Sequence, residues 1–277
     1  MFNFVRRTIL AASVAGLAAP AFAADPVYPT VEDTPPPPAV YEDTSYGGWY
    51  LRGDVDYHWS KFRGANYIRY GAPGEEGTFD TGKLKGAMSL GAGLGYQIDK
   101  HFRVDVTGDY WFKSKFTGST TGVCGILNTP CTSSDTSSYH ALLLLANAYV
   151  DLGTWHKITP YVGAGVGGAW VKWDKLRNID DNGETIHDGK KGWRFAYAVM
   201  AGASYCLTDN AKLDLGYRYS RIEGGKMFDY ANNGGPGWDK GIHAHEVRGG
   251  LRYQFGKSDC APKEAYVPYE PEPVVYK

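Results

Sequence analysis

The sequence predicts an all-β fold, namely an eight-stranded antiparallel up-and-down transmembrane β-barrel with long extracellular loops and short periplasmic turns. Three observations predict it. Eight segments alternate apolar and polar residues with a period of two, as half-buried strands do. The segments run for roughly 10 to 14 residues, which suits tilted strands that cross a hydrocarbon layer. The connections alternate between short and about 20 residues long, a pattern typical of outer-membrane barrels.

The composition excludes several classes of protein. The 277-residue chain has 29 Lys and Arg against 30 Asp and Glu, so it lacks the basic excess of a nucleic-acid-binding protein. Its 36 Gly, 21 Tyr and 8 Trp favour an all-β chain. Beyond the N-terminal segment the longest apolar run is residues 141–146, far short of the roughly 20 residues that a membrane helix needs.

The N-terminal segment has the pattern of a secretory signal peptide. Arg6 and Arg7 precede an apolar stretch, and Ala21 and Ala23 are the small residues that signal peptidase reads. Two Pro-rich regions flank the alternating segments and lack the apolar residues to build a core. The expected order is a signal peptide in residues 1–23, an acidic periplasmic linker in 24–46, the barrel in 47–256 and a Pro- and Tyr-rich periplasmic tail in 257–277.

The first three alternating segments each set one apolar face against one polar face, and the fourth sets an apolar face against Leu143, Leu145, Asn147, Tyr149 and Asp151. In residues 49–61 the odd positions are apolar or aromatic and the even positions are mostly charged. In residues 84–96 the even positions are apolar, and they oppose Lys85, Ser89 and glycines. In residues 102–112 and 140–152 the even positions are again mostly apolar. We expect the apolar faces to point outward.

The last four segments follow the same rule with one exception. In residues 161–173 small and apolar residues alternate with glycines, so either face could point outward. In residues 194–205, 212–219 and 246–255 the odd positions are apolar and the even positions carry most of the charge. With both termini in the periplasm, the long connections fall on the outer face, at residues 63–82, 114–138, 174–192 and 223–241.

Three runs of sequence resemble a known family. They are YVGAGVGGAW from residue 161, FAYAVMAGASYCLTDNAKLDLGYRYS from residue 195, and HEVRGGLRYQF from residue 245. They resemble the small outer-membrane β-barrel proteins of alphaproteobacteria, described as porin-family or RopB-like, within the OmpA/OmpX-type eight-stranded superfamily. The resemblance implies the fold rather than an activity. It also implies that the barrel-assembly machinery reads Tyr253 and Phe255, although the chain continues to Lys277.

The inward faces would fill the lumen with charge. An eight-stranded barrel is only wide enough for side chains to fill, so we expect an ion-paired plug, with a narrow or gated conduit as the alternative. The expected lumen network is Arg52, Asp54, Asp56, Lys85, Arg103, Asp105, Asp109, Asp151, Arg194, Lys212, Asp214, Arg218, Glu246, Arg248 and Arg252.

No cluster of residues predicts an enzyme, a metal site or a cofactor. Asp54, Asp56 and His58 share an inward face and could form an acid-base group, but the spacing places no serine nucleophile beside them. His243 and His245 match no metal-binding helix motif, and period-two spacing puts both on the outward face.

Export into an oxidising space allows the four cysteines to pair. Cys124 and Cys131 lie in the second long connection, close enough for a disulfide. Cys206 and Cys260 both fall on the periplasmic side, and a disulfide between them would hold the tail under the barrel.

The outer connections are rich in aromatic residues. They could bind a host surface, phage or haem, the last being implied by the resemblance, or they could be ordinary solvated loops. The candidate binding residues in these connections are Tyr67, Tyr70, Phe79, His187, Met227, Phe228, Tyr230 and Trp238.

The expected function is structural. The barrel would contribute to envelope integrity in the outer membrane of a Gram-negative bacterium, in contact with outer-membrane lipid, lipopolysaccharide and the barrel-assembly machinery. Some related barrels are joined to peptidoglycan through a mature Ala-Asp terminus, which here is Ala24 and Asp25; otherwise this dipeptide only satisfies signal peptidase. The alternatives are a surface ligand-binding protein or adhesin and a small-solute porin.

Overall fold

The computed structural model describes residues 47–70, 74–124, 129–232, 234–256 and 258–260. The predicted signal peptide and linker, with Ala24 and Asp25, lie outside the described residues, as does most of the predicted tail. The described part of the chain contains seventeen β-strands, and it has no helix that is long and apolar enough to cross a membrane.

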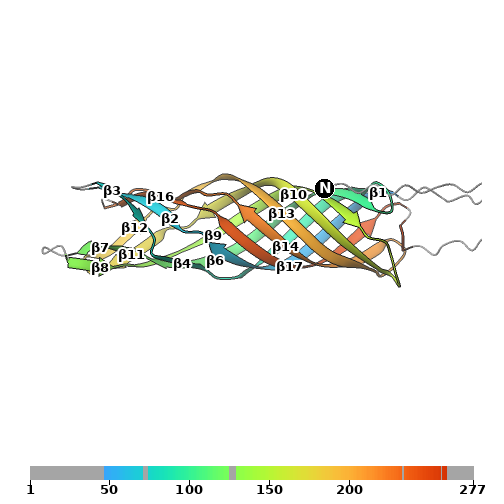
Figure 1. Ribbon diagram of the computed structural model, residues 1–277, viewed down its shortest axis with the longest axis horizontal. Coiled ribbons are helices and arrows are strands. Elements are labelled where there is room, and N and C mark those ends of the chain that lie inside the picture. The colour runs from blue at the N-terminus through green and yellow to red at the C-terminus, as the bar shows by residue number, and fades with distance from the viewer. Residues whose placement is uncertain (1–46, 71–73, 125–128, 233, 257, 261–277) are drawn as a thin grey trace, which may run out of the picture. The chain divides into compact units, whose positions relative to one another are not determined.

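Eight long strands form a closed antiparallel barrel (Figure 1). The ring closes where β17 pairs with β1, so that Asp54 lies opposite Gly250, and where β6 pairs with β9. The predicted all-β class, the number of strands and their antiparallel order are confirmed. The strands are β1 (Gly48–Phe62), β5 (Ala87–Gln97), β6 (Phe102–Ser119), β9 (Ser134–Asp151), β10 (Ile158–Trp173), β13 (Lys191–Cys206), β14 (Ala211–Ile222) and β17 (Ile242–Gln254).

Strand β10 settles the face that the sequence left open. Val162 and Val166 point outward, and the glycines between them point into the barrel. A Cβ atom on Gly163 would lie 2.4 Å from the Tyr149 ring, and one on Gly165 would lie 2.0 Å from Oδ1 of Asn147. The larger side chains of the neighbouring strand therefore occupy the space beside β10, and only glycine fits there.

The prediction for Lys85 is wrong, because the alternation slips by one residue at that point. Lys85 lies between β4 (Thr81–Leu84) and β5, where its side chain is exposed and outside the lumen. Leu84, expected to face outward, packs inward against the core. A Cβ on the next residue, Gly86, would lie 2.4 Å from the Tyr57 hydroxyl, so the chain is irregular where it passes that side chain.

The four long connections are largely β-structure and gather at one end of the barrel, which we call the capped end; the opposite end is the turn end (Figure 1). A four-stranded sheet runs β15-β16-β2-β3, β7 pairs with β8, and the β11–β12 pair and β4 extend the barrel wall. The cap strands are β2 (Ala65–Arg69), β3 (Glu75–Thr78), β4, β7 (Thr121–Cys124), β8 (Thr129–Thr132), β11 (Leu176–Asp180), β12 (Gly183–His187), β15 (Gly225–Phe228) and β16 (Gly234–Asp239).

The cap has an apolar core that continues into the barrel. Trp173 of β10 is 1% exposed, and its ring lies 5.7 Å from Phe116 of β6 and 5.2 Å from Tyr139 of β9. Met227 and Phe228 of β15 are buried in the same cluster. Burying such side chains contributes roughly 1.5–3 kcal/mol each, so the cap is a packed part of the fold rather than a set of solvated loops.

Candidate functional site: the filled lumen and its two ends

Arginine–carboxylate pairs fill the half of the lumen nearer the turn end. Arg52 donates to both oxygens of Asp54 at 2.8 and 2.9 Å and lies 3.3 Å from Asp105. Arg248 lies 3.1 Å from Asp54 and 3.4 Å from Asp56. All five side chains are buried, and a charge that is removed from water needs such a partner.

The network crosses the lumen from wall to wall. Arg218 of β14 donates to Asp109 of β6 at 2.8 Å, and β14 and β6 lie four strands apart in the ring of eight, on opposite sides. The same guanidinium donates to both oxygens of Glu246 at 2.6 and 2.9 Å. Because Arg218 is 0% exposed and contacts opposite walls, its side chain lies across the lumen.

A second group of charges lies closer to the turn end. Arg103 donates to Asp151 at 3.0 Å, and its guanidinium carbon lies 3.9 Å from the centre of the Tyr149 ring. Arg252 lies 3.4 Å from Asp214. Arg103 and Arg252 are each 1% exposed, and ion pairs and the cation–π contact replace the water that these arginines lose on burial.

One predicted lumen charge lies at the other end. Arg194 of β13 is 2.7 Å from Asp239 of β16, and Asp239 also accepts a hydrogen bond from the Trp173 indole at 3.1 Å. Burial raises the pKa of Asp239, although the Arg194 guanidinium opposes this effect. This pair holds a cap strand against the barrel wall.

The proposed acid-base group is dispersed into structural contacts. Asp54 and Asp56 pair with arginines, whereas His58 belongs to a layer that separates the charged half from the apolar half. The His58 ring stacks on Trp111 at 4.4 Å, and its Nδ1 lies 3.0 Å from the Ser60 hydroxyl. All these groups are buried, and a substrate would have to displace the surrounding side chains to reach them.

His243 and His245 lie on the outward face. Nδ1 of His245 is 2.5 Å from the Tyr217 hydroxyl, and Nδ1 of His243 is 2.7 Å from the Tyr219 hydroxyl. These pairs join β14 to β17 on the outward surface near the capped end, where both histidines alternate with buried inward residues of β17.

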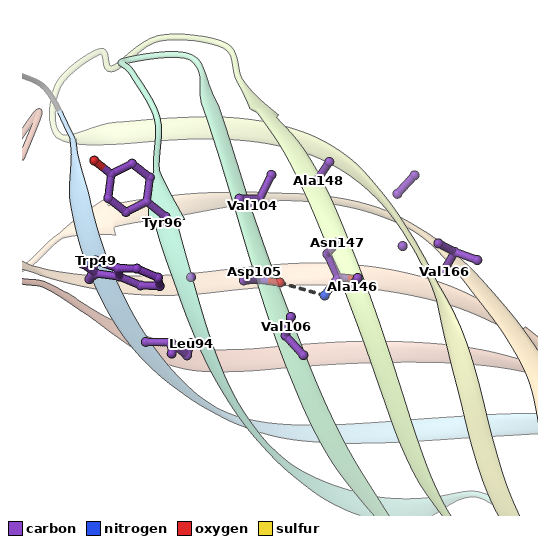
Figure 2. Close-up of a pocket in the computed structure, with 13 residues that line it drawn as sticks. Trp49, Leu94, Tyr96, Val104, Asp105, Val106, Ala146, Asn147, Ala148 and Val166 are labelled. Carbon is purple, nitrogen blue, oxygen red and sulfur yellow. Dashed lines mark hydrogen bonds between the residues drawn. The ribbon is translucent and has the colours of Figure 1, made fainter.

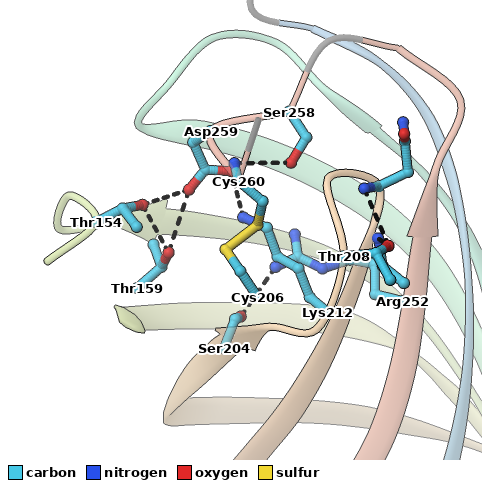
Figure 3. The surroundings of a disulfide bond; sticks show 12 residues. Thr154, Thr159, Ser204, Cys206, Thr208, Lys212, Arg252, Ser258, Asp259 and Cys260 are labelled. Atoms are coloured by element: carbon cyan, nitrogen blue, oxygen red, sulfur yellow. Dashed lines mark hydrogen bonds and ion pairs between the residues drawn. A yellow bond between two sulfur atoms is a disulfide. The ribbon is translucent and has the colours of Figure 1, made fainter. Parts of the chain in front are cut away.

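The turn end is closed by the short segment after β17 (Figure 3). The Cys206–Cys260 disulfide, with its Cα atoms 5.6 Å apart, joins this segment to the end of β13. The neighbouring Asp259 carboxylate pairs with the Lys212 ammonium and accepts hydrogen bonds from Thr154 and Thr159. We call Asp259 and the disulfide the latch. Tyr253 and Phe255 lie just before it, exposed on the outward face.

The second disulfide lies in the cap. Cys124 and Cys131 join the β7–β8 hairpin, with Cα atoms 5.8 Å apart. Among the described residues, they and Asp180 form the one cluster of potential metal ligands, and the disulfide engages both sulfur atoms. His187 is buried against the Phe228 ring at 4.9 Å, and its Nδ1 lies 2.9 Å from the Asp229 carbonyl oxygen.

A hollow of about 600 Å³ lies on the wall formed by β5, β6, β9 and β10 (Figure 2). Its floor consists of small outward residues, Ala146, Ala148 and Ala164, and the Trp49 and Tyr96 rings, 5.4 Å apart, border it on one side. The Asp105–Asn147 hydrogen bond of 2.7 Å closes the wall behind it. The lining is mostly apolar and faces outward.

The sequence analysis missed two site residues, Asp239 and Asp259. Each lies outside the alternating segments, and each is positioned by contacts with residues distant in the chain. The only local signal was Cys260, because a disulfide to Cys206 brings the adjacent Asp259 to the turn end.

The latch predicts a pH-dependent contribution to stability. Burial would raise the pKa of Asp259, but the Lys212 ammonium and the threonine hydroxyls outweigh burial and lower it. Its stabilising effect is therefore complete above about pH 4 and is lost as the pH falls through the lowered pKa. We expect Asp259→Asn to reduce the free energy of unfolding by about 1–3 kcal/mol at pH 7, because Lys212 stays buried without its partner.

Urea unfolding in detergent micelles from pH 7 to pH 2.5 measures this effect. The difference between wild type and Asp259→Asn should shrink as the pH falls. Asp209→Asn, at an exposed aspartate in the adjacent turn, is the matched control and should behave as wild type. A difference that is independent of pH would contradict the role of the carboxylate charge.

Comparison with known proteins places this barrel in a family. The family model described as "Outer membrane protein beta-barrel domain" matches residues 9–255. An uncharacterized protein of Brucella suis biovar 1 is 38% identical over 242 residues, covering 75% of this chain and 85% of the relative. A protein of Rickettsia rickettsii named "Putative adhesin" is 30% identical over 221 residues, covering 75% and 88%.

Among solved structures, Neisserial surface protein A is similar with 18% identity and a TM-score of 0.45, over 76% of this chain and 99% of that one. The outer membrane protein OprG of Pseudomonas aeruginosa has 13% identity and a TM-score of 0.45, over 75% and 96%. The match to the family model, with the Brucella relative, identifies the chain as a member of the outer membrane protein beta-barrel domain family, whose members lie in the outer membrane of Gram-negative bacteria.

Proposed function

We propose that this protein is a sealed structural barrel that contributes to the integrity of the outer membrane, after export through a signal peptide cleaved at Ala23. The bond from Arg218 to Asp109 across the barrel axis is the observation that supports this most directly. The apolar core of the cap supports it further, since it fills the opposite end of the same lumen. The proposal includes an orientation of the barrel, in which the cap is extracellular and the latch is periplasmic.

The proposal includes no catalytic turnover. The inward carboxylates that could act as acids or bases are engaged by arginines, as Asp54 and Asp56 are by Arg248. The partners are then outer-membrane lipid, lipopolysaccharide and, during assembly, the barrel-assembly machinery. The outward aromatics Tyr253 and Phe255 at the end of the last strand are where that machinery would bind.

Planar-bilayer recording tests whether the barrel is sealed. We expect the purified protein to give no reproducible unitary conductance, because opening the lumen would separate buried ion pairs, at several kcal/mol for each unpaired charge. A large porin reconstituted in the same way is the positive control. A stable open state would contradict the proposal and favour the small-solute porin.

The leakiness of the envelope in a deletion strain tests the role in envelope integrity. A deletion strain whose envelope leaks no more than that of wild type would contradict this role.

The same proposal includes a tether to the cell wall through Ala24. Its α-amine, with a pKa near 8, is partly neutral at physiological pH and can attack an acyl-enzyme. At about 3.1 Å per residue an extended linker of residues 25–46 reaches on the order of 65 Å. We expect mass spectrometry of lysozyme-digested sacculi to find Ala24-linked muropeptides, and a strain without L,D-transpeptidases to lack them. Their absence from wild type would leave an untethered barrel.

A surface-binding role is the second candidate, and the outer face of the cap sheet favours it. Tyr70 is 50% exposed and Trp238 is 37% exposed, and with Ile68 and Glu76 they line a hollow of about 440 Å³. The relative from Rickettsia rickettsii that is named as an adhesin agrees with this role.

Cell adherence separates the two candidates. In a non-adherent bacterial host, Tyr70→Ser with Trp238→Ser should abolish any adherence that the wild-type protein confers, because aromatic anchors dominate such interfaces. Val123→Ser with Ile186→Ser, also exposed in the cap, is the matched control. Adherence that survives the first pair would remove this candidate, and the envelope role should survive both pairs.

A further inference from the structure

Six basic residues circle the barrel near the capped end. They lie just beyond a band of aromatic residues, Trp59, Trp170 and Trp193, which we call the aromatic girdle. We call the six basic residues the basic collar, and its members come from, or directly adjoin, six of the eight wall strands. They are Lys61 of β1, Lys85 before β5, Lys115 of β6, Lys172 of β10, Lys191 of β13 and Arg221 of β14.

The strand register places the collar at one depth, next to the aromatic residues. Trp170 lies opposite Trp193, and two residues farther out Lys172 lies opposite Lys191. On β1, Lys61 follows Trp59 by two residues, and both side chains face outward. Aromatic residues on a barrel wall mark the level where the hydrocarbon ends, so the collar lies at the level of the lipid headgroups.

Neighbouring collar residues are in contact through the sheet. The backbone N–H of Lys85 donates to the carbonyl oxygen of Lys115 at 2.9 Å. Lys61 and Arg221 both pair with His243 of β17, one from each side. Lys172 and His140 are opposite each other, which links β10 to β9. The collar is thus a nearly continuous band around the wall.

Most of the collar has no counter-charge within the described part of the protein. Arg221 pairs with Glu223 at 2.9 Å, but the side chains of Lys61, Lys85, Lys115, Lys172 and Lys191 are exposed and form no salt bridge with any described residue. By contrast, Arg177 pairs with Glu184 at 2.7 Å in the cap. Lysines directly opposite each other, as Lys172 and Lys191 are, repel and destabilise a sheet. Such a pair is favourable only when an anion lies between or beside the ammonium groups.

The described residues of the turn end form no comparable band. Its turns, at residues 98–101, 153–157 and 207–210, carry two lysines, Lys100 and Lys157, and two aspartates, Asp99 and Asp209. Among the described residues, the excess of outward positive charge therefore lies at the headgroup level of one leaflet, the outer one in the proposed orientation.

We propose that the basic collar binds the phosphate groups of the glycolipid headgroups in the outer leaflet. The inference rests on the proposed orientation of the barrel. Lysine side chains that project sideways from the wall reach headgroups at that depth, and each contributes about 1 kcal/mol near an anionic surface. A soluble anionic polysaccharide would be met first by the distal cap rather than by a band beside the girdle.

The test uses the full-length protein in neutral detergent micelles, with bisphosphorylated lipid A as the probe and native mass spectrometry as the readout. Lys115→Gln, Lys172→Gln and Lys191→Gln are combined in the collar variant. The matched control removes the same charge elsewhere, through Lys100→Gln, Lys157→Gln and Lys226→Gln, all exposed outside the collar. Heat-modifiable migration in gels verifies that each variant is a folded barrel.

We expect the collar variant to bind lipid A about 100-fold more weakly than wild type at low ionic strength, and the control to bind within about threefold of wild type. Dephosphorylated lipid A should bind both proteins weakly. Equal affinity of wild type and collar variant for lipid A would overturn the proposal, as would inorganic phosphate displacing lipid A at equal concentration. Tighter collar-dependent binding of heparin than of lipid A would also overturn it, in favour of a polysaccharide.

A failure here is distinguishable from a failure of the proposed function. A conducting or adherent barrel would contradict the structural role while leaving binding of lipid A intact. A folded, sealed barrel that ignores lipid A phosphates would contradict the collar alone.

Discussion

The constraint on which the rest of this structure depends is that every charge turned into the lumen must meet an opposite charge there. Eight strands enclose too little space for water to hydrate a row of guanidinium and carboxylate groups. Arg218 shows how the fold answers this, because it pairs across the axis with Asp109 and beside it with Glu246. Such pairs cost desolvation and add little net stability, and a one-residue slip of a strand would turn its charges from the lumen to the outward face.

The lumen changes character along its length. Toward the turn end it is a lattice of ion pairs, and toward the capped end it is an apolar core around Trp173 and Phe116. The layer of His58 on Trp111 lies between the two. The apolar half gives the cap strands a surface on which to fold, and the Arg194–Asp239 pair fixes one of them to the wall. The same interior therefore fills the barrel and supports the cap.

Period-two alternation is a local property, and it predicted what depends on local sequence. The strands and their inward faces could be predicted because successive side chains of a strand point to opposite faces, whichever strand lies beside it. Lys85 could not, since the slip comes at Gly86, which lies against the Tyr57 side chain of a neighbouring strand, and local sequence does not reveal that contact. The cap could not be predicted for a stronger reason. Its sheet pairs β2 with β16, for example Ala65 with Asp239, and no short-range pattern links residues so far apart.

The Cys206–Cys260 disulfide gives the last part of the barrel an unusual covalent form. Residues 206–260 make a closed loop that crosses the wall twice, in β14 and β17, and passes through the cap between them. In the proposed orientation, a protease that cuts the cap segment of this loop, residues 223–241, leaves both fragments bonded on the periplasmic side. The nicked polypeptide migrates as one species until a reductant separates it, so surface cleavage by itself releases nothing from the cell.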